Sequence, residues 1–367
     1  MQIIKLIVLT GGPCAGKSTA MSWIQNAFSE RGYKVLFVPE TATELINGGV
    51  APWTCGTNAD YQCLQFHLQE VKEDIFIKAA KTMKDQKILI VCDRGMMDNK
   101  VYMNDEEYAD VVKRINLDEE KQRNKYDAVF HLVTAAKGEA EIYLSNKEGN
   151  AARIETVEQA CALDDKLIAA WTGHPHLRVI DNSSNFENKM KRLVSEIASF
   201  LGEPAPYEEE RKFLIEYPNI EELEKRPDCQ KIEIIQSYYN NMKGDEIRVR
   251  ELNDNDNKVF YKMVKKSVTS TTRIITEKRL TEKEYAALLE EAETSVHQIH
   301  KTRYCLTHEN QYFEIDIYPF WKDKAIVEIE LLQKDEEVRM PDFLKVIKEV
   351  TDNIEYKNFS LAKNFAK

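Results

Sequence analysis

Residues 11–18 have the types and spacing of a phosphate-binding loop. They read G-G-P-C-A-G-K-S, a complete G-x-x-x-x-G-K-S after the apolar run Ile3–Leu9. Glycines let such a loop curl so that its N–H groups point at phosphate oxygens, and the following helix adds the positive end of its dipole. We expect Lys17 to reach the β- and γ-phosphates of a nucleoside triphosphate and the Ser18 hydroxyl to bind Mg²⁺. The predicted nucleotide-binding residues are Gly11, Gly12, Pro13, Cys14, Ala15, Gly16, Lys17, Ser18 and Thr19.

Charged residues that suit phosphoryl transfer follow two further apolar runs. Asp93 and Arg94 come after Ile88–Cys92, and Glu40 comes after Val35–Val38. At the carboxyl edge of a parallel sheet, Asp93 would hold or orient Mg²⁺, and Arg94 would neutralise charge on a transferred phosphate. Glu40 has two interpretations: a general base for an acceptor hydroxyl, or a carboxylate that the dipole of the next helix favours.

Two polar residues further along are candidates for nucleotide contacts. Arg153 precedes a helix and is a candidate for a cis-acting catalytic arginine over the phosphates. Asn182 follows the run Leu177–Ile180, where a loop that contacts the base is expected. The stretch Asn124–Asp127 spells N-K-x-D, but it precedes an apolar run instead of following one. Guanine specificity therefore cannot rest on it.

The first half of the chain has the alternation of a parallel sheet. Short apolar runs alternate with amphipathic helical stretches at 17–31, 59–84, 157–171 and 186–201. A segment with one glycine and two prolines, Gly202–Pro206, then breaks the pattern. We predict a P-loop domain over residues 1–202, a linker over 203–207 and a second domain over 208–367. The predicted strands of the first domain are Ile3–Leu9, Val35–Val38, Ile88–Cys92, Ala128–Val133 and Leu177–Ile180.

The second half alternates apolar and charged residues with a period of two, which is typical of antiparallel strands. Strands are expected from residue 211 to residue 332, with helices at 282–293 and 341–352. The charged residues face either solvent or the lumen of a barrel, where basic residues and carboxylates would bind a polyphosphate. The predicted fold class is a parallel α/β sheet flanked by helices, followed by an α+β domain that consists of an antiparallel β-barrel with peripheral helices.

Composition limits the partners and the compartment. The 367 residues include 51 basic and 62 acidic ones, for a net charge of -11, which argues against nucleic acid as the main partner. Seven scattered cysteines without a C-x-x-C pair indicate free thiols in a reducing compartment. The N-terminal apolar run is too short for a signal peptide or a membrane span. We expect a cytoplasmic protein.

Residues 1–200 resemble the AAA-type P-loop family that includes nicotinamide-riboside kinase domains and, more distantly, deoxynucleoside kinases. The resemblance is carried by G-G-P-C-A-G-K-S, V-P-E-T-A-T-E-L, V-C-D-R-G-M-M-D and Y-D-A-V-F-H-L, and by residues 152–182. In those kinases a Glu after the second strand is the base, and a carboxylate–Arg pair follows the third strand. The resemblance assigns these roles to Glu40, Asp93 and Arg94, and it leaves the acceptor open.

Residues 206–345 resemble the CYTH family, also called triphosphate tunnel metalloenzymes, which hydrolyse triphosphates or cyclise ATP with Mg²⁺ or Mn²⁺. The match rests on E-x-E-x-K from Glu208 to Lys212 and on an ordered series of basic strands. Ile275 stands where the family has a lumen carboxylate, which argues against turnover but not against anion binding. The resemblance implies metal-side carboxylates at Glu208, Glu210, Glu328 and Glu330, and phosphate-side cations at Lys212, Arg248, Arg250, Lys262, Arg273 and Arg303.

The combination of these two domains resembles the TRPL translocation defect protein group. This resemblance implies GTP binding by the first domain, phosphatidic-acid binding by the second and peripheral contact with a membrane. Two functions remain open. One is a regulatory protein that binds GTP or ATP together with a triphosphate or a phosphatidic-acid headgroup. The other is a bifunctional enzyme with small-molecule kinase and metal-dependent triphosphatase activities. Mg²⁺ is the expected cofactor, with Mn²⁺ as an alternative in the second domain.

Overall fold

The chain folds into two compact units, Met1–Val194 and Ser195–Lys367. The structure, a computed structural model, describes residues 2–141, 143–144, 155–203, 209–239, 246–254, 257–267, 273–290, 297–331 and 337–364. The linker over 203–207 stays a prediction, because most of it lies outside these ranges. Among the described helices, none is both long and apolar enough to cross a membrane.

The first unit contains a parallel sheet whose strands are confirmed to within two residues at each end. Its order is β2-β3-β1-β4-β5, and every described pair is parallel. The strands form because they are continuous apolar runs, as a sheet buried on both faces requires; Ile7, Val8 and Leu9 are fully buried. The bounds are β1 (Ile3–Gly11), β2 (Lys34–Val38), β3 (Lys87–Asp93), β4 (Ala128–Leu132) and β5 (Leu177–Ile180).

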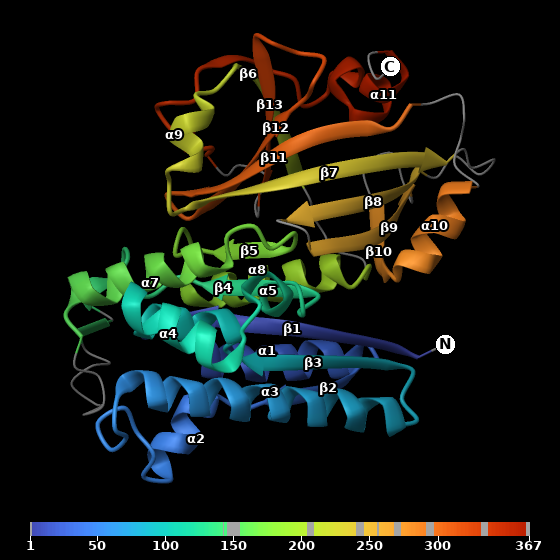
Figure 1. Cartoon of the computed structure of the whole chain (residues 1–367). Helices are drawn as coiled ribbons and strands as arrows, with labels where there is room; N and C mark the ends of the chain where they lie inside the picture. Colours follow the sequence, from blue (N-terminus) through green and yellow to red (C-terminus); the bar gives the residue numbers. More distant parts are fainter. Residues whose placement is uncertain are drawn as a thin grey trace. The chain divides into compact units, whose positions relative to one another are not determined.

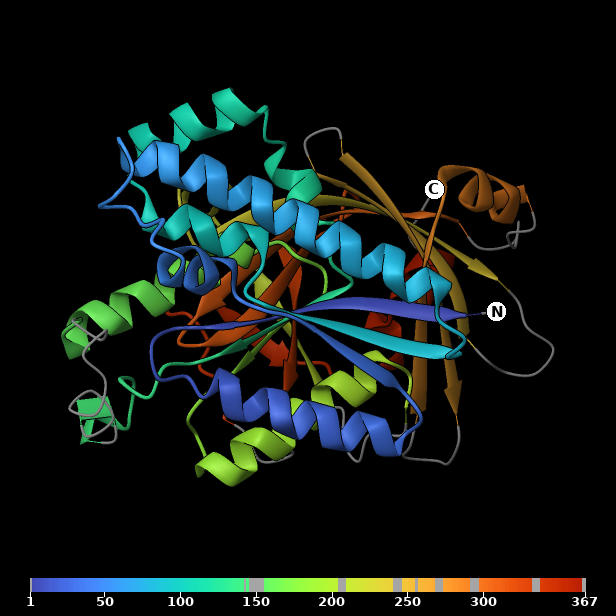
Figure 2. The same ribbon diagram turned by 90° about the horizontal axis from the view of Figure 1, so that it is seen from below.

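Helices cover both faces of this sheet. Helices α1 (Lys17–Glu30) and α8 (Phe186–Phe200) lie on one face, and α3 (Asn58–Thr82) with α4 (Asp105–Ile115) lies on the other (Figure 2). Because the strands are parallel, the loops at their carboxyl ends meet at one edge of the sheet, where ligands bind in such folds. The other helices that the structure describes in this unit are α2 (Thr41–Asn47), η1 (Met96–Tyr102), α5 (Glu119–Arg123) and α7 (Val157–Trp171).

The second unit contains an antiparallel sheet of nine strands in the order β10-β9-β8-β7-β11-β12-β13-β6-β14 (Figure 1). Short helices α9 (Ile220–Glu224), α10 (Glu282–Glu290) and α11 (Asn358–Asn364), with the 3-10 turn η2 (Ile354–Tyr356), accompany it. The strands are β6 (Glu209–Glu216), β7 (Cys229–Tyr239), β8 (Glu246–Asp254), β9 (Asn257–Ser267), β10 (Arg273–Leu280), β11 (Ile299–His308), β12 (Gln311–Ile317), β13 (Lys324–Leu331) and β14 (Val346–Glu349).

Two features of this unit differ from the predictions. The described strands do not close a barrel: β10 and β14 are the two edges, and no described ladder joins them. The helix expected at 341–352 is replaced by β14, which hydrogen-bonds the open edge of β6 across a register shift. The physical reason is that β6 would otherwise leave a row of backbone N–H and C=O groups without partners.

The apolar core of β6, β12 and β13 lies on one face of the sheet. Phe213, Phe313, Ile315, Val327 and Ile329 are buried there, and they pack with side chains from α9 and from residues 338–344. Because side chains alternate along a strand, the residues between them point to the opposite face. That face carries the charged residues considered below.

Candidate functional site

The loop between β1 and α1 is sharply curled. Gly16, just before α1, has a φ of 93° and Cys14 has a φ of 57°, so both lie in the left-handed region. Gly11, at the end of β1, has a φ of 153°, and a Cβ there would lie 2.2 Å from the carbonyl oxygen of Leu132. Only glycine fits that position. Lys17 follows as the first residue of α1, beside the N–H groups that a helix start leaves open.

Lys17, Asp93, Glu40 and Arg94 meet at the carboxyl edge of the sheet. Asp93 is the last residue of β3, and its Oδ1 lies 3.9 Å from Lys17 Nζ. Arg94 has a φ of 69°, and its Nε donates to Glu40 Oε1 at 2.5 Å. Two cations and two carboxylates, singled out in three separate stretches of sequence, therefore form one cluster.

Burial and mutual charge set the protonation states of this cluster. Burial lowers the pKa of Lys17 and raises that of Asp93. Burial alone would raise the pKa of Glu40, but Arg94 and Lys17 bring it below its ordinary value. Glu40 is also the N-cap residue of α2, yet its side chain makes no cap bond and instead accepts from Arg94 and Thr43. Its carboxylate is thus ionised and held toward the cluster.

Two buried atoms of the cluster point to a ligand. Within the described residues, Asp93 Oδ1 and Arg94 Nη1 have no hydrogen-bond partner, which is costly for buried polar atoms. Ser18 is exposed at the start of α1 and can add a hydroxyl oxygen. A carboxylate and a hydroxyl suit a hard cation such as Mg²⁺, and a guanidinium N–H suits a phosphate oxygen. The residues present therefore fit a magnesium-bound phosphate.

A buried polar network fixes the segment that carries Arg94. Asp98 accepts the N–H of Gly95 at 2.8 Å, the hydroxyl of Thr10 at 2.7 Å and the indole N–H of Trp171 at 2.9 Å. A Cβ on Gly95 would lie 2.6 Å from the Trp171 ring. These contacts hold the chain tightly behind Arg94 and so maintain its positive φ.

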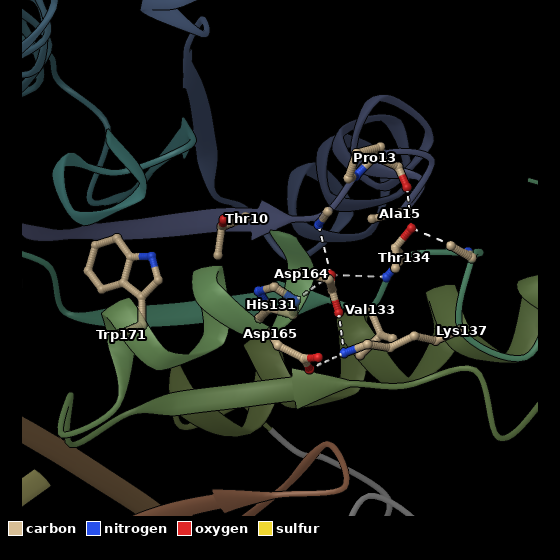
Figure 3. A network of polar contacts seen from close by, with 12 residues as sticks. Thr10, Pro13, Ala15, His131, Val133, Thr134, Lys137, Asp164, Asp165 and Trp171 are labelled. Carbon is tan, nitrogen blue, oxygen red and sulfur yellow. Dashed lines mark hydrogen bonds and ion pairs between the residues drawn. The ribbon is translucent and has the colours of Figure 1, made fainter. Parts of the chain in front are cut away.

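Asp164 of α7 holds the phosphate-binding loop through a hydrogen bond to its backbone (Figure 3). Its Oδ1 accepts the N–H of Gly12 at 2.9 Å and the N–H of Thr134 at 3.1 Å, and it lies 2.9 Å from His131 Nε2. Its Oδ2 pairs with Lys137 at 2.9 Å. Burial would raise the pKa of Asp164, but His131 and Lys137 lower it to about 2. Asp164 is therefore a fully buried anion that holds the first turn of the loop.

Asn182, predicted to contact the nucleotide, lies beside Asp164 and its partners, where it bonds Thr134, Lys137 and Lys189. Its Nδ2 donates to the carbonyls of Thr134 and Lys137, each at 2.8 Å, and its Oδ1 accepts from Lys189 at 2.7 Å. Both N–H groups of Asn182 are therefore occupied, and its Oδ1 keeps one lone pair that could accept a bond from a nucleotide base. Arg153, the predicted arginine over the phosphates, lies outside the described residues.

In the second unit, charged residues are buried on the face opposite the apolar core. Lys212 Nζ lies 2.6 Å from Glu328 Oε1 and 2.8 Å from Glu210 Oε1. Arg303 donates to both oxygens of Asp316, at 2.7 and 2.8 Å, and to Glu328 at 3.0 Å. Burial would lower the pKa of Lys212, but Glu328 and Glu210 raise it. These charges are not a solvated outer face, since Arg303 and Glu328 are 6% and 7% exposed.

Strand register decides which other basic residues share this face. Arg248 pairs with Tyr238, and Arg250 pairs with Gln236, which places both on the face of Arg303. Lys262 pairs with Val249, on the opposite face beside the core under α10, so the expectation that it joins the other cations is corrected. Arg273 pairs with Ser267 by backbone register, but its side chain lies outside the described residues, as does Glu208.

The carboxylates on this face do not form a ready metal site. Glu328 is occupied by Lys212 and Arg303, and Glu210 by Lys212. Glu330 pairs with Glu210 in the strand register and is exposed. No group of three or more potential ligands occurs among the described residues. As described, these residues therefore do not fit a bound divalent metal.

Comparisons with known proteins place the first unit in a family. A family model described as an AAA domain matches residues 6–189, slightly more than half of the chain. The chain belongs to this AAA-domain family. No curated protein matches it. Solved structures similar to parts of the chain include the inorganic triphosphatase NE1496 (22% identity over 44% of this chain and 97% of that chain, TM-score 0.30) and PH1819 from Pyrococcus horikoshii OT3 (21% identity, 35% and 80%, TM-score 0.27).

The AAA domain holds its phosphate-binding loop with residues that sequence reasoning missed. Asp164 and Lys189 contact the loop although they are about 150 and 170 residues away from it in the chain. A signal was present, since each is a charged residue on the apolar stripe of its helix. Asp164 lies one turn after the buried Ala160 and one turn before the buried Ile168.

Proposed function

We propose that the AAA domain binds Mg²⁺ with a nucleoside triphosphate, either ATP or GTP, and transfers the γ-phosphoryl group to a hydroxyl of a small molecule. The observation that carries this proposal is the cluster of Lys17, Asp93, Arg94 and Glu40 at one edge of the sheet. A protein that only binds nucleotide needs the loop and Lys17. It has no need of an ionised carboxylate held beside an arginine at the same edge.

Each residue has a role in this proposal. Lys17 and the loop N–H groups would bind the phosphates, and Arg94 Nη1 would meet the transferred group. Ser18 and Asp93 would hold the metal ion, which supplies positive charge to the β- and γ-phosphate oxygens. Glu40 would accept the proton of the acceptor hydroxyl. The hydroxyl oxygen would form a bond to the γ-phosphorus, and the bond between that phosphorus and the bridging oxygen of the β-phosphate would break.

Replacing Lys17 by alanine tests the nucleotide site. We expect at least tenfold weaker binding of Mg–ATP and Mg–GTP, because the variant loses a charged hydrogen-bond donor to the phosphates. Titration calorimetry with each nucleotide measures the loss and the base preference together. Lys78→Ala, an exposed lysine of α3, is the control and should bind as the wild type does. Equal affinity of Lys17→Ala and wild type would contradict the proposal.

We further propose that the second unit binds an anionic phosphate ligand, either a triphosphate or a phosphatidic-acid headgroup. The observation in its favour is that Arg248 and Arg250 share a face with the buried cations Lys212 and Arg303. Arg248 and Arg250 thereby add two further positive charges to the face that carries Lys212 and Arg303, which suits an anionic ligand. The resemblance to the TRPL translocation defect protein group connects phosphatidic-acid binding with a role in membrane trafficking.

The strand register offers a matched test of this second site. The double substitution Arg248→Gln with Arg250→Gln should weaken tripolyphosphate binding at least tenfold, and Lys262→Gln, on the opposite face of the neighbouring strand, should not. Vesicles with phosphatidic acid, compared with vesicles of phosphatidylserine, distinguish a lipid headgroup from a free phosphate chain. Phosphate release with Mg²⁺ or Mn²⁺ distinguishes turnover from binding. If the double variant binds tripolyphosphate and phosphatidic-acid vesicles with wild-type affinity, this proposal is wrong.

A further inference from the structure

Lys189 is a buried cation that binds the back of the phosphate-binding loop. It lies in the first turn of α8 and is 3% exposed. Its Nζ donates to the carbonyl oxygens of Ala15 at 3.3 Å and Val133 at 2.7 Å, and to Asn182 Oδ1 at 2.7 Å. These three acceptors belong to the loop itself, to the chain just after β4 and to the chain just after β5. One ammonium thus joins three segments at the carboxyl edge of the sheet.

The number of donors matters at this position. A protonated lysine has three N–H groups, and three protein oxygens use them, so none is left for a nucleotide. A neutral amine has only two N–H groups, and at least one of the three oxygens would then lose its donor. If Ala15 loses its donor, the loop is released just before Gly16 and Lys17. The charge state of Lys189 therefore controls how firmly the loop is held.

We propose that Lys189 is a positioning residue for nucleotide binding, which holds the loop in its binding shape without touching the nucleotide. The proposal rests on the proposed nucleotide site of the AAA domain and adds a means by which the affinity of that site is set. Asp164 also holds the loop, because it accepts the N–H of Gly12. Two buried charges of opposite sign, one from α7 and one from α8, therefore hold the loop.

Burial lowers the pKa of Lys189 to about 8, so its charge changes close to neutral pH. The charged groups around it are Asp164 of α7, Glu139 after β4, Asp181 after β5 and Arg192 of α8; the three carboxylates favour the ammonium, and Arg192 opposes it. Carboxyl and guanidinium groups do not ordinarily change charge between pH 7 and 9. Nucleotide affinity should therefore fall as pH rises through about 8, where Lys189 loses its proton.

The stability of the nucleotide-free protein should respond in the opposite direction. A lowered pKa means that the folded chain binds this proton less tightly than the unfolded chain does. The contribution of Lys189 to the free energy of unfolding therefore increases as pH rises from about 8 toward 10.5. A lysine that only supports the fold would show this rising stability without the falling affinity. This divergence separates positioning from general support of the fold.

The test compares Lys189→Met, Lys189→Arg and Lys191→Met with wild type by titration calorimetry with Mg–ATP and Mg–GTP from pH 7 to 9.5. Lys189→Met should bind about 10- to 100-fold more weakly at pH 7 and show less pH dependence than wild type. Lys189→Arg keeps the charge and should restore affinity without the decline above pH 8. Lys191, which is 58% exposed and pairs with Glu187, is the control on the same helix and should not matter.

Proton uptake on binding gives a second measurement, made on wild type and on Lys189→Arg. Bound phosphate adds negative charge near Lys189, so binding should take up protons at pH 8 to 8.5, seen as a dependence of the binding heat on the ionisation heat of the buffer. Lys17 also has a lowered pKa, and proton uptake that persists in Lys189→Arg belongs to it. Absence of uptake, or equal affinity of Lys189→Met and wild type, overturns the inference. Failure of wild type to bind either nucleotide overturns the proposed function instead.

Discussion

Replacement of Glu40 by glutamine is expected to slow phosphoryl transfer by about 10²- to 10⁴-fold while nucleotide affinity changes little. The amide keeps the size of the side chain and can still accept the Arg94 Nε–H bond, which is 2.5 Å long in the wild type. It cannot take up a proton from an acceptor hydroxyl. Transfer from Mg–ATP or Mg–GTP is measured with nicotinamide riboside and deoxynucleosides as acceptor probes, which carry the hydroxyl group that the proposed transfer needs.

Glu44→Gln is the matched control for this experiment. Glu44 lies on α2, is exposed, and pairs with Lys72 at 2.5 Å. It should transfer phosphate at the wild-type rate. Equal rates for Glu40→Gln and wild type would remove Glu40 from the chemistry and leave it as the N-cap residue of α2. Tight nucleotide binding without transfer to any probe would favour the regulatory, binding-only alternative.

The rate of phosphoryl transfer should depend on pH in a way that the pKa of Glu40 sets. A base works only when ionised, so the rate is lost as pH falls through the pKa of the group. Arg94 and Lys17 hold the pKa of Glu40 below 4.5, so no loss from this group is expected until the pH is below that value. A loss centred near pH 6 would identify a different proton acceptor.

The charged cluster of the AAA domain was predictable because each of its residues follows an apolar strand. In a parallel sheet, strand ends with the same direction meet at one edge, so Glu40, Asp93 and Lys17 had to converge. The contacts of Asp164 and Lys189 with the phosphate-binding loop were not predictable in this way. Asp164 and Lys189 reach the loop from helices, and their contacts depend on how α7 and α8 pack on the sheet, which local pattern does not specify.

In the second unit, alternation predicted which residues of one strand share a face, but not how neighbouring strands align. A shift of one residue exchanges the two faces of a strand. Lys262 illustrates this, because it pairs with Val249 while its neighbour Tyr261 pairs with Arg250. The sequence where β8 gives way to β9 is rich in Asn and Asp, and such a sequence is compatible with several turn lengths, so it did not predict this register. The closed barrel was a longer extrapolation from the same pattern.

The second large effect is expected from Arg303→Met, which should lower the free energy of unfolding of the second unit by about 3–5 kcal/mol. Arg303 contacts three carboxylates, Asp316, Glu328 and Glu314, and it is itself buried. Methionine fills much of the space but leaves these acids without their guanidinium partner. Denaturant unfolding of the full chain, followed by hydrogen exchange of β11 and β12, locates the loss in this sheet.

Arg226→Met is the control, since Arg226 pairs with Asp228 at 2.8 Å near the surface. Its loss should lower the free energy of unfolding by no more than about 1 kcal/mol.

The pH dependence of the stability of Arg303→Met adds an independent check. Burial already raises the pKa of Glu314, and loss of Arg303 would raise it further, so the folded variant would bind protons that the unfolded chain releases. The loss in free energy of unfolding that Arg303→Met causes, relative to wild type, should therefore become smaller as the pH is lowered from 7.5 to 5. If the deficit is as small as that of Arg226→Met and constant with pH, the three acids are solvated in solution, and Arg303 is open to an anionic ligand without the loss of any protein contact.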